Sequence, residues 1–450
     1  MLSLDETPSV EIRTRETIFT PIGTYKPTRL AEIGGTMVKD GVFIDRRNGT
    51  PMEMDAYGAY LALKGEERRS GVSKEGDRRA VVARLEARRE ACGGFWTHGA
   101  WTKSDKEIHL RFTAAAVRLL TEAHADGLYP NTLALTEILK RHLSYRETLT
   151  PGVWFLHDTL ELPDIGIHVP ELPLPSDVWG STTTNCLVLN THVDTLITLI
   201  DALERVDLAP ADRAELEALT RDAVGTLFFV LKDRSSLAQA AFSVVDGLIR
   251  HFMFSVQNTG NRILNYAKWR IIDHYYKFRR NIKIATKSFI FSDGYLERDI
   301  GLQGYFFDYH IYNLHDLARF ALIARRNGFI DAEQSAQLAG VIHKAIDYAC
   351  ANPYLKLVQE SLAQNGRMAV LCEAMLARAA LTSCFAFPAA WSRVFAEVTA
   401  AVAPTPALLG YDPHILRSAT EVEGHTTYEL LDGSRVCFDR ASGLLAPAKD

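Results

Sequence analysis

Residues 184–206 read TNCLVLNTHVDTLITLIDALERV, and this stretch decides the predicted fold. It predicts a helix that is apolar on most sides, and such a helix must be buried among other helices. Asn190 and Asp194 are four residues apart and share one face, whereas His192 points about 160° away, so these three cannot form one metal site. The pattern fits either a binding role for Asn190 and Asp194 or hydrogen bonding between helices.

Amphipathic stretches on both sides of this helix extend the same pattern. They predict about ten helices in the centre of the chain, joined by alternating short and long connections. Helical hairpins with their loops gathered at one end favour a mainly α fold, an α/α toroid in which residues 184–206 belong to the inner ring. An irregular helical bundle is the competing architecture. The predicted helices cover residues 78–92, 107–125, 131–143, 184–206, 210–232, 235–256, 261–280, 308–327, 331–351, 366–385 and 388–402.

Both ends of the chain differ from this centre. Residues 1–75 predict irregular structure with some β-strand, including a tight turn at Asn48-Gly49. Residues 76–403 form the predicted toroid domain. Residues 404–450 predict a β-hairpin extension, because Asp432-Gly433 lies between two alternating runs. This hairpin is a possible contact in a homo-oligomer.

Composition excludes several classes of protein. The net charge of −5 argues against nucleic acid as a partner, since general nucleic-acid binders carry a basic excess. No apolar run approaches the roughly 20 residues of a transmembrane segment, and the N-terminus does not resemble a secretory signal. The six cysteines are scattered and predict reduced thiols. We therefore expect a cytoplasmic protein, and the sequence predicts no cofactor and no metal.

The densest polar and aromatic segment runs from Phe291 to Arg319. Such a density of acids, bases and rings is typical of a sugar-handling or proton-transferring site. The alternative is an internal network of caps and ion pairs. The candidate catalytic residues here are Tyr295, Glu297, Asp308, Tyr309 and His310, and the candidate binding residues are Arg298, Asn313, Asp316 and Arg319.

Two aromatic loops add candidates. The first carries Trp96, His98 and Trp101, which fit stacking on sugar rings and proton transfer, or else a helix-capping loop with both tryptophans in the core. The second, residues 145–182, is predicted to be a long loop with His157, Asp158 and the candidate sugar-stacking Trp179. Long loops in compact domains are often functional.

Residues 268–287 alternate basic and aromatic side chains. This run fits attraction to an anionic polymer or a membrane surface, although a solvated helix face is the simpler interpretation. Phosphate-binding glycine loops, a serine-nucleophile elbow and a His-Glu-x-x-His helix are all absent from the sequence. Their absence disfavours nucleotide-driven, serine-hydrolase and zinc-protease chemistry.

Two segments carry a resemblance. Asp308-Tyr-His-Ile-Tyr-Asn-Leu-His-Asp-Leu-Ala-Arg319 resembles the starts of helices in α/α-toroid proteins that act on uronic-acid polysaccharides, of the glucuronyl epimerase and toroid polysaccharide lyase type. Leu189–Leu196 is similar to inner helices of such toroids. The resemblance implies the toroid fold and assigns no catalytic residue. The lack of a secretion signal departs from what a polysaccharide lyase usually needs.

The resulting hypothesis is an epimerase or lyase that acts on an acidic, uronate-containing saccharide or another small polar substrate. A base removes the proton beside the carboxylate while an arginine, Arg298 with Arg319, neutralises it. A glycoside hydrolase using Glu297 with Asp308 or Asp316 is an alternative. The other alternative is a non-catalytic helical scaffold that binds a partner through its loops.

Overall fold

A computed structural model of the chain describes residues 36–39, 42–45, 52–97, 107–162, 178–182, 184–232, 236–255, 261–302, 304–305, 307–351, 368–401, 415–439 and 441–448. Twelve α-helices lie in these residues, so the predicted mainly α fold is confirmed. They are α3 (Glu53–Ser70), α4 (Glu75–Ala91), α5 (Leu110–Ala125), α6 (Thr132–Ser144), α7 (Leu189–Arg205), α8 (Pro210–Leu231), α9 (Leu237–Ser255), α10 (Arg262–Thr286), α11 (Phe307–Arg326), α12 (Ala332–Cys350), α14 (Met368–Thr382) and α15 (Ala389–Ala401).

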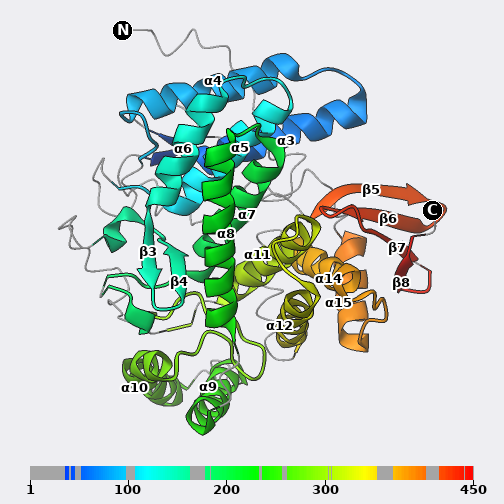
Figure 1. Cartoon of the computed structure of the whole chain (residues 1–450). Coiled ribbons are helices and arrows are strands. Elements are labelled where there is room, and N and C mark those ends of the chain that lie inside the picture. Colours follow the sequence, from blue (N-terminus) through cyan, green and yellow to red (C-terminus); the bar gives the residue numbers. More distant parts are fainter. Residues whose placement is uncertain are drawn as a thin grey trace.

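Ten of these helices form two layers (Figure 1). Helices α3, α5, α7, α11 and α14 pack side by side in that order, and each also packs against the helix that follows it in the chain, α4, α6, α8, α12 or α15. Along the chain, each helix of this row is therefore followed by a helix that packs against it. Among the described residues, α3 and α14 do not pack extensively against each other, so the closed ring of a toroid is not shown.

Helix α7 lies at the centre of the inner row. Every residue from Leu189 to Leu203 is buried, because α5, α8 and α11 all pack against this helix. The apolar residues of the stretch join one continuous core with those of the neighbouring inner helices. The prediction that this helix is buried among other helices is confirmed.

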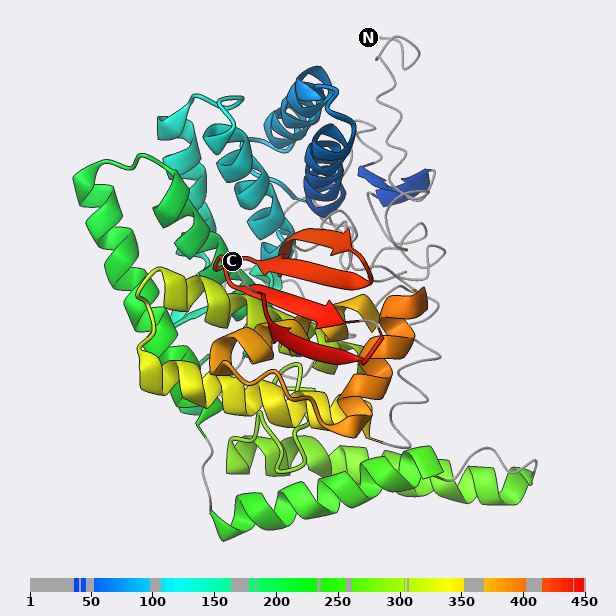
Figure 2. The same cartoon turned by 90° about the vertical axis from the view of Figure 1, so that its right-hand side faces the viewer.

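Short β-structures complete the fold. Strands β1 (Thr36–Lys39) and β2 (Val42–Asp45) form one antiparallel pair, and β3 (Arg146–Leu149) and β4 (Gly152–Phe155) form another. Strands β5 (Leu416–Val422), β6 (His425–Leu430), β7 (Arg435–Asp439) and β8 (Leu444–Pro447) form an antiparallel sheet in sequence order. It lies beside α14 and α15 (Figure 2).

The predicted turn at Asp432-Gly433 is confirmed, because Gly433 adopts a positive φ of 84° between β6 and β7. The turn at Asn48-Gly49 lies outside the described residues. Two expectations are wrong. Residues 1–75 contain helix α3, which packs on α5, and the long loop predicted at 145–182 begins with the β3–β4 hairpin.

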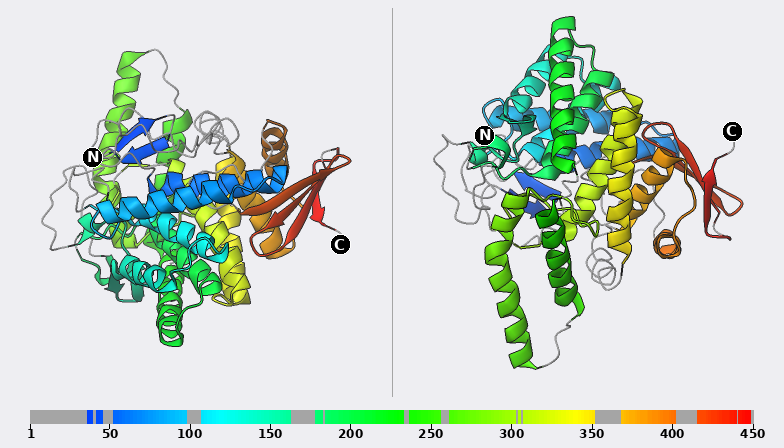
Figure 3. Two further views of the ribbon diagram at one scale, coloured as in Figure 1. Left: turned by 90° about the horizontal axis from the view of Figure 1, so that it is seen from above. Right: turned by 60° about the horizontal axis from the view of Figure 1, so that its bottom comes forward.

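Helices α9 and α10 stand apart from the two layers. They pack against each other and extend from the body as a helical hairpin, seen at the bottom of Figures 1 and 2 and below the body in the right panel of Figure 3. Asn261 starts α10, since its side chain accepts hydrogen bonds from the backbone N–H groups of Ile263 and Leu264. None of the described helices combines the length and the apolar character needed to cross a membrane.

Candidate functional site

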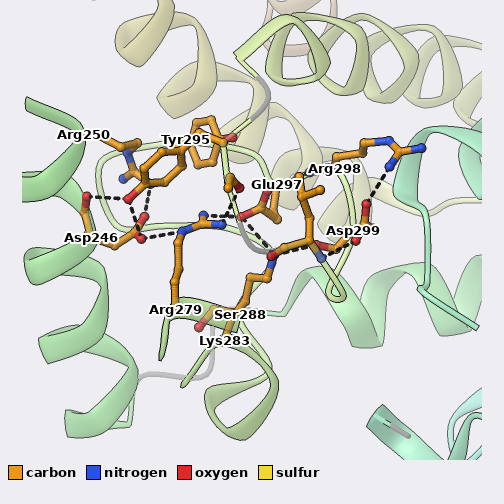
Figure 4. A network of polar contacts seen from close by, with 12 residues as sticks. Asp246, Arg250, Arg279, Lys283, Ser288, Tyr295, Glu297, Arg298 and Asp299 are labelled. Carbon is orange, nitrogen blue, oxygen red and sulfur yellow. Dashed lines mark hydrogen bonds and ion pairs between the residues drawn. The ribbon is translucent and has the colours of Figure 1, made fainter. Parts of the chain in front are cut away.

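The loop between α10 and α11 carries the densest predicted segment, and its side chains point to two sides (Figure 4). One side faces α9 and α10. There Asp246 accepts hydrogen bonds from Arg279 Nε at 2.8 Å, from Tyr305 at 2.9 Å and from Arg250. These charges are buried and paired, and this side of the loop therefore ties the hairpin to the body.

Glu297 belongs to this buried network. Its carboxylate pairs with Arg279 and lies 3.3 Å from Lys283 Nζ. Burial lowers the pKa of Lys283 to about 8, although the nearby Glu297 carboxylate opposes that shift. The Glu297 carbonyl accepts a hydrogen bond of 2.8 Å from Asn313 Nδ2, which fixes the loop to α11. Glu297 and Asn313 therefore hold the loop in place, and neither side chain is exposed to solvent.

Tyr295 and His310 lie in the same buried region. The Tyr295 ring stacks on His310 and lies 4.4 Å below the guanidinium of Arg250. His310 Nδ1 accepts from the backbone N–H of Leu296 at 3.0 Å, and Nε2 donates to the carbonyl of Ala345 at 3.0 Å. Burial lowers the pKa of His310 to about 3 and raises that of Tyr295. Both side chains are shielded from solvent, so the predicted catalytic roles of Tyr295 and His310 do not fit this geometry.

A second buried network joins the inner helices α5, α7 and α11. Asp316 accepts from Arg111 at 2.6 Å and from Arg319 at 3.1 Å, and Asp194 accepts from Arg118 at 2.7 Å. The carbonyl of Asn190 accepts from Arg111 Nη1 at 3.2 Å. The predicted binding residues Asn190, Asp194, Asp316 and Arg319 do lie together, but as interhelical contacts inside the protein.

The other side of the α10–α11 loop presents Arg298. Its Nη1 donates to Asp299 Oδ2 at 3.0 Å, its Nη2 lies 3.3 Å from His157 Nε2, and its guanidinium stacks over the Tyr309 ring at 4.7 Å. We call His157, Arg298 and Tyr309 the mouth cluster, because they lie where α7 and α11 begin. All three are half-buried, whereas the carboxylates of Asp246, Glu297, Asp194 and Asp316 in the networks described above are buried.

The hydrogen bonds of His157 define its tautomer. Arginine only donates, so Nε2 of His157 must accept from Arg298 and carry a lone pair. Nδ1 therefore carries the proton and donates to Thr191 Oγ1 at 2.7 Å, at the start of α7. This arrangement holds a neutral imidazole with its basic nitrogen beside a guanidinium.

Titratable groups around the mouth cluster are strongly perturbed. Burial, together with Arg298 and Arg111, lowers the pKa of His109 to about 3, and the His109 ring meets the His157 ring edge-on at 4.4 Å. Burial raises the pKa of Glu161 to about 7, despite hydrogen bonds from the backbone N–H groups of His157 and Cys186. Perturbed groups of this kind gather at functional sites, although structural networks produce them too.

The predicted aromatic platforms lie elsewhere or outside the described residues. Trp96 is fully buried and donates from Nε1 to the carbonyl of Leu85 at 3.1 Å. Trp179 is buried and stacks on Phe289. Neither ring offers a face to a sugar, so their predicted stacking role is wrong. His98 and Trp101 lie outside the described residues, as does the side chain of Asp308.

One hollow in the described part of the protein lies away from the mouth cluster. A cavity of about 770 Å³ lies between α12 and α14 and is lined by residues that include Asp331, His343 and Arg378. None of the predicted site residues lines it. In the described part of the chain, no three His, Cys, Asp or Glu side chains are placed to share a metal ion.

Sequence reasoning singled out Arg298 and Tyr309 but did not include His157, His109 or Glu161 among the site residues. His157 does lie in residues 145–182, the segment that the sequence predicts to be a long and functional loop. Nothing in the sequence pairs it with Arg298, because 141 positions separate the two residues.

No protein-family model, curated protein or solved structure matches this chain.

Proposed function

We propose that the mouth cluster binds the carboxylate of a uronate-containing saccharide and exchanges the proton on the adjacent carbon. The observation that carries this proposal is the half-buried contact of His157, a neutral base, with Arg298, an anion-binding group. An epimerase and a lyase share this first step. The two-layered rows of helices support the finer proposal that the body is an open form of the α/α toroid.

Arg298 is suited to the carboxylate. A guanidinium grips a carboxylate with two parallel hydrogen bonds and neutralises the charge that builds up when the neighbouring carbon loses its proton. The N-termini of α7 and α11 add a positive potential at the same place. A substrate carboxylate would replace His157 as the acceptor at Arg298 Nη2 and leave the Nε2 lone pair available.

His157 is suited to the proton. Thr191 orients the ring through Nδ1, so Nε2 removes the proton from carbon, and the electron pair moves onto the carboxylate held by Arg298. Tyr309, whose ring lies 4.7 Å from the Arg298 guanidinium, then supplies a proton. Delivery to the same carbon from the opposite face gives the epimer, whereas delivery to the departing glycosidic oxygen gives an unsaturated sugar.

The hydrolase alternative gains no support from these contacts. Glu297 and Asp316 are both buried and each is bound by two cationic side chains, so neither has the open position that attack on a sugar needs. The scaffold alternative predicts partner binding without any chemistry at the mouth cluster.

Proton NMR in heavy water with a panel of uronic-acid oligosaccharides tests the proposal. We expect deuterium beside the carboxylate, or an unsaturated-sugar signal, and a loss of about 100-fold or more in His157→Gln. Arg298→Gln should weaken both binding and turnover. In Tyr309→Phe, the substrate proton beside the carboxylate should still be exchanged for solvent deuterium, while product should form more slowly.

His425→Gln is the matched control, because His425 is exposed on β6 far from these residues in the chain. No exchange with any uronate between pH 5 and 9 contradicts the proposal. New reducing ends without deuterium would indicate hydrolysis instead.

A further inference from the structure

The α9–α10 hairpin exposes a large apolar surface that the mouth cluster does not explain. On α10, Leu264, Ile271 and Phe278 follow one another at seven-residue spacing and are 55%, 52% and 58% exposed. Residues at this spacing lie on one stripe of a helix. On α9, Val244 and Leu248 are likewise exposed, and among the described side chains of that helix no Asp, Glu, Lys or Arg is exposed.

Basic side chains lie on one flank of the α10 stripe. By the rotation of about 100° per residue, Arg270 and Lys277 lie about 100–120° from the stripe, and both are exposed. Long basic side chains beside an apolar face are typical of helices that lie in the plane of a membrane. Tyr266 and Trp269 lie about 140–160° from the stripe by the same rotation, so they face away from a membrane that the stripe enters.

The charge of the hairpin is opposite to that of the chain. Residues 237–286 hold eight Lys and Arg against two Asp, whereas the whole chain has a net charge of −5. Arg250, Arg279 and Lys283 are paired internally with Asp246, Asp293 and Glu297. Of the other basic residues, Arg262, Arg270 and Lys277 are exposed, and Asp273 is the one further acid within residues 237–286 of the sequence.

We propose that the α9–α10 hairpin docks on the surface of an anionic lipid bilayer, with the α10 stripe in the interfacial layer and Arg270 and Lys277 at the headgroups. Charge complementarity favours this occupant over a symmetric contact between the hairpins of two chains, because two hairpins of like charge would repel each other. Helix α10 is long enough to lie along the surface over about 37 Å. This inference is independent of the proposed activity.

Co-sedimentation of the full chain with vesicles tests the inference. Vesicles of phosphatidylcholine with about one third phosphatidylserine should bind the protein, pure phosphatidylcholine should bind it far more weakly, and raising the NaCl concentration should release it. Arg270→Gln with Lys277→Gln should weaken binding about 25-fold, from about five-fold for each basic residue. Ile271→Ser with Phe278→Ser should weaken it at least about 10-fold.

Arg79→Gln with Arg393→Gln is the matched control. It removes the same charge from exposed positions on α4 and α15 and should bind as the wild type does. All these side chains are exposed, so the variants keep the fold, which circular dichroism verifies. Three results overturn the inference: no binding to anionic vesicles at low salt, equal losses in the control, or a dimer in light scattering that Ile271→Ser with Phe278→Ser abolishes.

Discussion

Asp246→Asn should loosen the α9–α10 hairpin specifically. Asp246 is fully buried and accepts hydrogen bonds from Arg250, Arg279, Tyr275 and Tyr305, on three separate segments. Removing one member of a buried ion pair costs about 3–5 kcal/mol. Both arginines keep other acceptors here, so we expect the lower end, about 3 kcal/mol.

This value predicts a measurable local effect. Backbone amides of α9 and α10 that exchange through opening of the hairpin should exchange about 100-fold faster with solvent deuterium, while α5 and α7 change little. Asp273→Asn is the matched control, because Asp273 is exposed on the same hairpin. Equal acceleration in both variants, or equal acceleration over the whole chain, would refute the assignment of Asp246 as the link between hairpin and body.

The pH of this experiment matters. Burial by itself would raise the pKa of Asp246, but Arg279 and Arg250 outweigh it and lower the pKa below its ordinary value. A carboxyl with a depressed pKa stabilises the fold above about pH 4 and loses that effect as the pH falls through its folded value. Hydrogen exchange should therefore be measured near pH 7, where the full contribution is present.

Two further predictions concern stability. Burial raises the pKa of Glu161 to about 7, so the stabilising effect of its protonated form is fully present below about pH 4.3 and is lost as the pH rises through 7. The melting temperature of the wild type should therefore fall relative to that of Glu161→Gln between pH 5 and 8. A constant difference between the two melting temperatures would contradict this prediction. Gly294→Ala should cost at least about 2 kcal/mol in denaturant unfolding, because Gly294 has a φ of +95° and its new Cβ would overlap the carbonyl of Lys344. Gly340→Ala, in open space on α12, should be neutral or stabilising, and a similar loss in both alanine variants would oppose this reasoning.

The sequence predicts the helices well because each carries its own pattern of apolar residues. The expected ranges of α4, α6, α8 and α12 agree with the structure within about three residues at each end. The β3–β4 hairpin was missed because its strands have only four residues each, too few for a clear alternation. Helix α3 was missed because it lies in a segment interpreted as irregular.

The site was harder to predict, because side-chain chemistry alone does not reveal burial. Tyr295 and His310 have the side chains that proton transfer needs, yet packing against Arg250 and the backbone of Leu296 and Ala345 encloses both. His157 and Arg298 meet only after α7 and α11 have packed side by side. Tertiary contacts of this kind cannot be inferred from spacing along one segment.

The dense polar segment 291–319 combines two functions in one loop and one helix. Glu297 and Arg298 are neighbours in sequence, but Glu297 pairs with Arg279 on the hairpin side, while Arg298 pairs with Asp299 and points away from Arg250 and Asp246 (Figure 4). On the buried side, the charged side chains hold the loop and the hairpin together as ion pairs. Burying any one of these charges without its partner would cost free energy. The half-buried side holds a guanidinium, an imidazole and a phenol within reach of solvent, which cohesion alone does not require. This difference in exposure, more than the types of residue, separates the candidate site from the network that supports it.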